Sequence, residues 1–272
     1  MTAPQTIINT IADMFEADMR WGIFAKSTLA HERKLKPALR KVFKLQREEV
    51  EGRVRAYGWM AQVRSTKAMF DPWLFNSEDW DVRLENAARP YLEDSMREGY
   101  TTASADIVRQ SGTVWFHADF NVRDPHIAEL LADKLHKFSF SVNDTTLKLL
   151  KAEFAEALAR GEAIRAIQER VGKVFKFTSK VRTERIARTE IIGTANRGNF
   201  EAMLASGVVK TKKWRATRDA RTRDAHRHLD GEEVPVRAKF SNGLVHPGDW
   251  DGPAEEIINC RCTMVHGKFV GE

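Results

Sequence analysis

The residues best suited to chemistry gather toward the carboxyl end of the sequence. The run Asp224-Ala225-His226-Arg227-His228 is followed by Asn242 and His246, and then by Cys260 and Cys262. Imidazole, thiolate and carboxylate groups are the usual protein ligands of zinc and of catalytic divalent ions. The set therefore allows a metal-binding structural site or a metal-dependent enzyme.

The two cysteines are separated by a single residue, Arg261, and no other cysteine occurs in the chain. A disulfide between positions i and i+2 strains the geometry that the bond requires, and a chain in a reducing cytoplasm would not keep it. We therefore expect Cys260 and Cys262 to be free thiols or metal ligands.

An enzymatic interpretation starts from the order Asp-His, Asn, His. His226, Asn242 and His246 occur in the order found in metal-dependent ββα (HNH-like) nucleases, in which a histidine activates water and the other residues hold the ion. The spacing from Asn242 to His246 is short, and the sequence has no P-loop, nucleophile elbow or dinucleotide fingerprint. We expect a protein that is not an enzyme, with a metal-dependent nuclease as the alternative.

Positive charge is concentrated in two blocks. Residues 26–67 hold twelve basic and four acidic residues, and residues 182–227 hold twelve basic and five acidic, within a net charge of +6. Such blocks are either solvated helix faces or surfaces that contact phosphates. Because alternate residues of a strand share a face, we expect several cations of the second block to contact nucleic acid. They are Lys210, Lys212, Lys213, Arg215 and Arg218.

Composition and length limit the class of protein and the number of domains that can position these residues. The chain has 272 residues, of which 42% are hydrophobic and 30% charged, as expected for a soluble globular protein of one large or two modest domains. Its uncharged stretches are too short to cross a bilayer, so no membrane contact is expected. Residues 1–15 lack a basic start and include Asp13, so we expect no secretory signal.

Helix-forming residues dominate the chain up to Gly207. The pattern predicts helices over 9–24, 29–70 and 77–104, with boundaries at Pro37 and Asp71-Pro72. Further helices are predicted over 127–138, from an Asp144 cap to Gly161, over 162–171 closed by Gly172, and over 179–205 closed by Gly207. The last of these carries residues that are mostly small on one face, which permits close approach of another element. They are Ala187, Ile191, Ala195, Gly198 and Ala202.

Beyond Gly207 the pattern changes to short β-type segments. We predict strands over 208–217, 234–240 and 263–270, separated by turn residues. The fold class expected is therefore α+β, predominantly α-helical with a small C-terminal β-containing motif domain. An Asp-Pro turn near residue 124 suggests an N-terminal helical module over 1–120 and a second domain over 121–272, with helices in 126–206 and a β-rich unit in 208–272.

An ordered set of short motifs runs through the second domain. The elements are Ala187-Arg188-Thr189-Glu190, Trp214, residues 219–226, Leu229-Asp230-Gly231, Pro247-Gly248-Asp249 and Asn259-Cys260-Arg261-Cys262. This set resembles the Mu F-like family of tailed-phage minor head proteins, also called head-morphogenesis proteins, over about residues 121–267.

The resemblance implies a structural protein of the phage head that acts in head assembly and in DNA packaging or ejection. Its implied partners are the portal protein, major capsid or scaffold proteins, and non-specific DNA. Its implied location is the virion, in the capsid interior or at the portal vertex, with the host cytoplasm during assembly.

The resemblance also bears on metal binding, because many members carry a Cys-x-x-Cys pair and a His-Pro pair that look like a zinc knot. Here Arg223 and His226 stand at the first pair, and Ile257-Ile258 at the second. The candidate zinc ligands that remain are His226, Cys260 and Cys262, with His228, His246 or Asp219 as a fourth ligand. We expect no cofactor, with the cysteines packed as small hydrophobic residues, and zinc is the alternative.

In either case we expect the motif residues to form a structural latch that joins the last helix to the β unit. A network of charge-assisted hydrogen bonds would hold the loop in place. The residues are Arg188, Glu190, Asp219, Arg221, Arg223, His226, Asp230, Gly231, Asn259, Cys260, Arg261 and Cys262.

Overall fold

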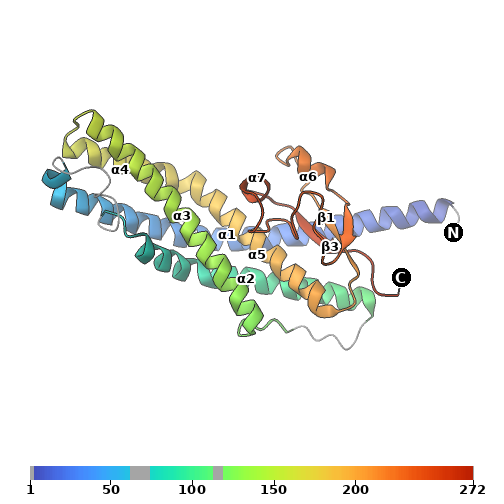
Figure 1. Cartoon of the computed structure of the whole chain (residues 1–272). Helices are drawn as coiled ribbons and strands as arrows, with labels where there is room; N and C mark the ends of the chain where they lie inside the picture. Colours follow the sequence, from blue (N-terminus) through green and yellow to red (C-terminus); the bar gives the residue numbers. More distant parts are fainter. Residues whose placement is uncertain (1–2, 62–73, 113–118, 272) are drawn as a thin grey trace. The chain divides into compact units, whose positions relative to one another are not determined.

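The computed structural model describes residues 3–61, 74–112 and 119–271, and it is mainly helical with one small sheet (Figure 1). This confirms the predicted α+β class. The elements are α1 (Ala3–Ala61), α2 (Ser77–Ser111), α3 (Pro125–Ala159), α4 (Ile164–Phe177), the π-helical turn η2 (Thr178–Arg182), α5 (Thr183–Ser206), β1 (Thr211–Arg215), α6 (Asp224–His228), β2 (Glu233–Pro235), α7 (Ala254–Ile257) and β3 (Thr263–His266). No helix in these ranges is long and apolar enough to span a membrane.

The chain forms two compact units that do not follow its order. Unit 1 consists of residues 1–33, 91–124 and 186–272, and unit 2 of residues 34–90 and 125–185. Helices α1, α2 and α5 each contribute to both units. The division at residue 120 stays a prediction about modules of the sequence, whereas the compact units are assembled from segments on both sides of it.

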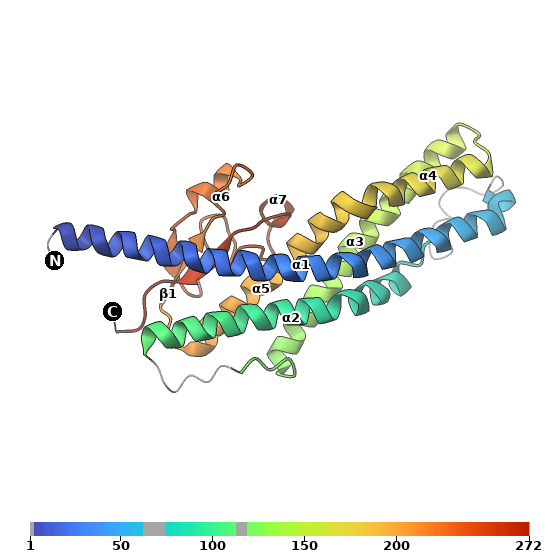
Figure 2. The ribbon, with the colours of Figure 1, turned by 180° about the vertical axis from the view of Figure 1, so that it is seen from behind.

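Unit 2 is a packed set of long helices. The later part of α1, the first part of α2, and α3 and α4 lie side by side in two opposite views (Figures 1 and 2). A buried amide pair ties them together: Gln46 Nε2 donates to Asn143 Oδ1 at 2.8 Å, and Asn143 Nδ2 donates to Asp81 Oδ1 at 2.6 Å. Arg182 adds a hydrogen bond from its guanidinium to the Val142 carbonyl at 2.7 Å.

Several predicted helix boundaries are wrong, because tertiary packing stabilises continuous helices at those positions. Pro37 lies inside α1, where Leu35 and Leu39 are both fully buried on the opposite face of the same turns. Asp144 does not cap a helix but lies inside α3, where it pairs with Lys148 at 2.7 Å. Gly172, expected to close a helix, lies within α4. The Asp71-Pro72 boundary falls outside the described residues.

In unit 1, α5 packs against α2 at backbone distance. A Cβ atom on Gly198 of α5 would lie 2.1 Å from the Met96 carbonyl oxygen, and one on Gly99 of α2 would lie 2.1 Å from the Ala195 carbonyl oxygen. The predicted small-residue face is confirmed, since Ala187, Ala195 and their neighbours on that face are buried. Gly207, expected to end the helix, has φ +65°, which favours glycine.

The sheet is antiparallel, with strand order β2-β1-β3. Lys212 pairs with Val234 of β2 and with His266 of β3. Along β1 the side chains alternate, so that Lys212 and Trp214 are buried while Thr211, Lys213 and Arg215 are half-buried on the other face. The sheet therefore packs Trp214 against the loops that carry the motif residues.

The predicted strands lie at the expected positions in the sequence, but the observed strands are shorter than predicted. The predicted strand over 234–240 is wrong beyond Pro235, because the chain turns there and Ala238 N–H bonds to the Pro235 carbonyl at 2.9 Å. The predicted strand over 263–270 ends at His266. Proline at the end of β2 cannot donate to a further ladder hydrogen bond, which is consistent with the early end of that strand.

Candidate functional site

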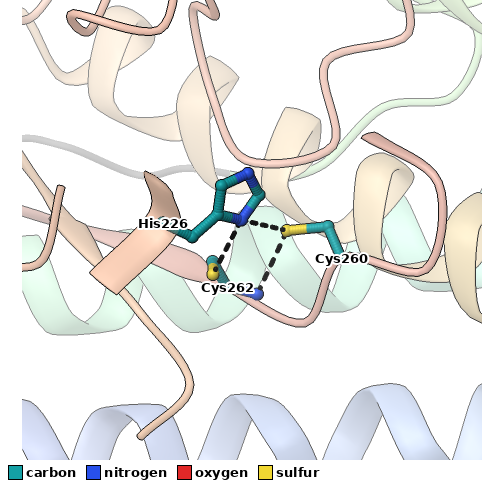
Figure 3. Close-up of side chains that lie close together, drawn as sticks. All are labelled: His226, Cys260 and Cys262. Atoms are coloured by element: carbon teal, nitrogen blue, oxygen red, sulfur yellow. Dashed lines mark hydrogen bonds between the residues drawn. The ribbon is translucent and has the colours of Figure 1, made fainter. Parts of the chain in front are cut away.

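His226, Cys260 and Cys262 form a buried triad in unit 1 (Figure 3). His226 lies on the short helix α6, and the cysteines lie between α7 and β3. The Nδ1 atom of His226 is 3.6 Å from Cys260 Sγ and 3.5 Å from Cys262 Sγ. The backbone N–H of Cys262 donates to Cys260 Sγ at 3.4 Å, so the two thiols share one turn.

The second ring nitrogen of His226 is held by a carboxylate. His226 Nε2 lies 2.9 Å from Glu256 Oε2 on α7, and Asn242 Nδ2 donates to the same oxygen at 3.0 Å. The ring also contacts Trp214 edge-on, with centroids 5.3 Å apart. The orientation of the imidazole is therefore set from three sides, with Nδ1 pointing at the sulfur atoms.

The electrostatics of the triad favour one thiolate. The hydrogen bond from the Cys260 thiol, opposed by burial and assisted by His226, lowers the pKa of Cys262, whereas the same bond and burial raise the pKa of Cys260. Burial opposes protonation of His226, but its contacts with Cys262 and Glu256 outweigh burial and raise its pKa. The buried site thus combines one anionic sulfur with an imidazole that is readily cationic.

These donors also fit a zinc ion. With Zn–N near 2.0 Å and Zn–S near 2.3 Å, a tetrahedral ion places nitrogen and sulfur ligands about 3.5 Å apart, which matches both N–S distances. Metal-bound histidines almost always donate their other N–H to a carboxylate or carbonyl, as Glu256 allows here. No fourth His, Cys, Asp or Glu joins this group within the described ranges, so His228, His246 and Asp219 are not brought into it.

The residues expected for a nuclease do not form an ion site. His226 is only 1% exposed and Asn242 contacts Glu256, so neither presents a free ligand to solvent. His246 is fully buried against the rings of Phe200 and Trp250. The only His, Cys, Asp and Glu cluster with metal spacing among the described residues is the triad itself.

A second group of contacts fastens the loop before α6 to the turn that carries the cysteines. The Arg261 guanidinium donates two hydrogen bonds to the Asp219 carboxylate, one of them at 2.7 Å, and these bonds hold the pKa of Asp219 well below its usual range. Thr217 Oγ1 donates to the Arg261 carbonyl at 2.8 Å. Arg223, also from this loop, donates to the Ile258 carbonyl.

Contacts from α5 reach the same turn. The Arg188 guanidinium donates to Asn259 Oδ1 at 2.6 Å, and the Asn259 N–H donates to Thr189 Oγ1 at 2.8 Å. Asn259 has φ +63°, a left-handed conformation that asparagine tolerates better than most residues. The expected contact between the Ala-Arg-Thr-Glu motif and the Asn-Cys-Arg-Cys turn is therefore present in the structure.

Asn196 is the residue of this region that the sequence interpretation missed. Its amide is fully buried on α5, and Nδ2 donates to the carbonyls of Pro247 and Cys262, each at 3.0 Å. Its Oδ1 accepts from Thr263 Oγ1 at 2.8 Å. A buried asparagine on a helix face of small apolar residues was the available signal, because asparagine is a weak helix former that needs partners when buried.

The other expected motif residues have local roles. Asp230 accepts from the Ala216 N–H at 3.1 Å and from Arg218 Nε at 3.0 Å, and Gly231 has φ +87° in the following turn. Arg221 is exposed and lies 3.6 Å from Asp219. Glu190 is buried on α5, where its carbonyl accepts from Thr194.

The expected nucleic-acid cations do not share one exposed face. The prediction is wrong for Lys212, which is fully buried with Nζ above the rings of Phe200 and Phe240, at 4.5 and 5.3 Å from their centroids. Burial lowers the pKa of Lys212 to about 8. Of the remaining cations, three lie near acidic groups. Lys213 lies 3.3 Å from Glu233, Arg215 lies 3.9 Å from Asp230, and Arg218 pairs with both Asp230 and Asp18, whereas Lys210 is exposed.

The motif region is also where the chain matches known proteins. Residues 148–265 match the family model described as phage Mu protein F like protein. Over these residues the chain is similar to the phage Mu protein F-like family. The match includes α5, β1, β2, most of β3 and the triad, so the contacts of the triad and of the Asn-Cys-Arg-Cys turn lie inside the matched region.

Two curated relatives share part of this Mu F-like chain. The minor head protein GP7 of Bacillus phage SPP1 is 30% identical over 119 residues, covering 41% of this chain and 38% of the relative. A protein of Enterococcus faecalis named NAD(+)–arginine ADP-ribosyltransferase EFV is 30% identical over 146 residues, covering 53% of this chain and 30% of the relative. The chain thus spans about a third of the length of either relative. No solved structure matches.

Proposed function

We propose that this Mu F-like protein is a minor component of a tailed-phage head that acts in head assembly and in DNA packaging or ejection. In this role it contacts the portal protein and major capsid or scaffold proteins from the capsid interior or the portal vertex, and it touches DNA without sequence preference. The observation that carries the proposal is the interlocked motif region, whose residues hydrogen-bond to one another and to the backbone of neighbouring loops.

The latch is well suited to a protein that must hold its form inside a particle. Arg188 and Asn196 connect α5 to the turn at Asn259 and to the loop at Pro247, while Arg261 connects that turn to Asp219 in the loop before α6. Charge-assisted and bidentate hydrogen bonds of this kind are stronger and geometrically more specific than neutral ones. In this proposal the motif is structural and has no bond-breaking role.

The proposal is tested by locating the protein in particles. In cells producing the phage that encodes it, the chain should co-sediment with heads at a copy number far below that of the major capsid protein, and its deletion should lower infectious titre. A control strain carrying the gene in trans should restore both. A chain that stays entirely in the soluble fraction, with titre unchanged by deletion, would contradict the proposal.

The relative named as an ADP-ribosyltransferase does not alter this proposal, because the shared region covers only 30% of that protein. The nuclease alternative is tested separately by incubating the purified chain with supercoiled plasmid, with and without Mg²⁺. We expect no nicking in either condition. Cleavage that requires Mg²⁺ and disappears in His226→Ala would replace the structural role with a catalytic one.

We also propose that the triad holds zinc. Zinc there would cross-link α6 to the turn between α7 and β3 and would add folding free energy to the latch. The support is the donor set, the two N–S distances and the carboxylate on Nε2.

Metal analysis of the untagged protein tests this. We expect about one zinc per chain in the native protein and none in Cys262→Ser. Glu256→Gln should keep the fold while weakening zinc binding about 10- to 100-fold, as loss of a carboxylate behind a ligand usually does. A folded native chain that binds no zinc even when zinc is supplied would show that the triad is a hydrogen-bonded thiol and imidazole cluster.

A further inference from the structure

A basic strip on α1 lies outside the family region, and none of the motif contacts uses it. Residues 34–47 of α1 contain six basic residues and no acidic residue. Lys34, Arg40, Lys41, Lys44 and Arg47 are exposed, while Leu35, Leu39, Val42 and Phe43 are buried in the core of unit 2. The helix is therefore apolar on its inner face and almost uniformly positive on its outer face.

Three of the six basic residues of this strip are not paired with an acid among the described residues. Lys34, Arg40 and Lys41 make no ion pair with any residue that the structure describes. At the end of the strip Lys44 lies 3.7 Å from Glu48 and Arg47 2.7 Å from Glu51, and Lys36 also has an interaction partner. This differs from β1 and the residues after it, where Lys213, Arg215 and Arg218 each lie near an acidic side chain.

We propose that the outer face of α1 over residues 34–47, hereafter the α1 strip, binds the phosphate backbone of double-stranded DNA without sequence preference. This proposal adds to the proposed function by naming the surface that contacts DNA. It rests on the proposed function for the choice of DNA, rather than another polyanion, as the partner. From Lys34 to Arg47 the helix rises about 20 Å, which corresponds to about six base pairs of duplex.

The chemistry of the strip favours duplex DNA over other anionic partners. Among residues 34–47 no aromatic side chain is exposed, so the strip has no platform on which the bases of a single strand could stack. Leu45 is the only large apolar side chain exposed in this stretch, which is too little to insert into a lipid surface. What remains is a rigid row of cations, which suits contact with a regular row of phosphates.

The test is a titration of a duplex of random sequence with the full chain at several salt concentrations. The triple variant Lys34→Gln, Arg40→Gln, Lys41→Gln should reduce the slope of log K against log salt by about 2.7, which is 0.9 for each of the three phosphates that the variant no longer neutralises. At 0.1 M salt this corresponds to a loss of affinity of about 500-fold.

A matched control removes the same net charge from α3 and the turn that follows it, in the same unit. Lys137, Lys148 and Arg160 each pair with an acid four residues earlier, at 2.8, 2.7 and 2.5 Å. The triple change of these residues to glutamine should leave the salt slope within about one of the native value. Equal losses in both triple variants would show that only net charge matters and would overturn the proposal.

Two further outcomes would overturn the α1 strip as a DNA surface. One is a native chain that does not bind duplex, and the other is tighter, strip-dependent binding to single-stranded RNA or to phosphatidylserine vesicles. Circular dichroism of both triple variants confirms that the helices persist. Failure here leaves the particle test untouched, because a chain can enter heads through protein contacts alone, so the two proposals fail separately.

Discussion

Replacing Gly198 with alanine should destabilise unit 1 by about 3 kcal/mol, the upper part of the usual range for overpacking. The added Cβ would lie 2.1 Å from the Met96 carbonyl oxygen and 3.0 Å from the Tyr100 nitrogen, both in the backbone of α2. Backbone atoms of a helix cannot move aside like the end of a side chain. The helices must therefore separate, and the reciprocal approach of Gly99 to the Ala195 carbonyl would be disrupted with them.

Thermal unfolding followed by circular dichroism measures this effect, with an expected drop in Tm of about 6 to 12 °C. Gly22→Ala is the matched control, because Gly22 also lies inside a helix of unit 1 and a Cβ there would meet nothing within 4 Å. That change should raise stability by about 0.5 to 1 kcal/mol through helix propensity alone. A Gly198→Ala protein as stable as the native one would contradict the close approach of α5 and α2.

Asn196→Asp should cost about 3 kcal/mol or more at neutral pH. The substitution keeps the shape of the side chain but puts a carboxylate oxygen where Nδ2 donates to the carbonyls of Pro247 and Cys262. Two buried carbonyls then lose their donor, at about 1 to 3 kcal/mol each, and face a negative charge.

The pH dependence of that variant follows from burial. A buried carboxylate without a donor has a folded-state pKa above its unfolded value of about 3.9, so the folded variant binds more protons than the unfolded one. The deficit relative to the native protein should therefore be greatest at neutral pH. It should shrink as the pH falls through the folded-state pKa toward 4, because the protonated acid can donate one hydrogen bond again.

Denaturant unfolding of both proteins at pH 7 and pH 4.5 measures the change, and Asn199→Asp supplies the comparison. Asn199 lies one turn away, is only partly buried and donates a single hydrogen bond, to the Met264 carbonyl at 2.8 Å. Its substitution should cost about half as much and depend less on pH. Equal losses at the two positions would mean that Asn196 does not anchor both loops.

Local patterns were enough to predict features that depend on residue size and spacing. The face of α5 that packs closely against α2 could be predicted from small residues at helical intervals. The end of α5 could be predicted from Gly207, which follows these residues. Pro37 shows where the same reasoning failed. Helix propensity predicts a boundary at Pro37. The helix continues past this residue because burial of Leu35 and Leu39 stabilises it, while the missing N–H of the proline removes only one hydrogen bond.

Most residues of the site could be predicted from the sequence, but Asn196, Glu256 and the pairings between residues could not. Because side chains alternate along a strand, Lys212 and Trp214 lie on the same face of β1. Burial of the tryptophan therefore buries the lysine as well, which a count of charges along the sequence does not show. The contact of His226 with Glu256 joins residues 30 positions apart, and no local period signals it. Pairings of this kind come from tertiary packing, which a single sequence does not display.

The interleaved make-up of the two units has a consequence for synthesis on the ribosome. All residues of unit 2 have emerged once position 185 has left the exit tunnel, whereas unit 1 needs its first, middle and last segments together. The surface of α2 around Gly99 and the early turns of α1 therefore remain exposed until the last segment, residues 186–272, has been made, and chaperones or neighbouring chains can bind them in that interval. A fragment cut to the family boundaries would lack the same partners, so expression trials should retain the residues before position 148.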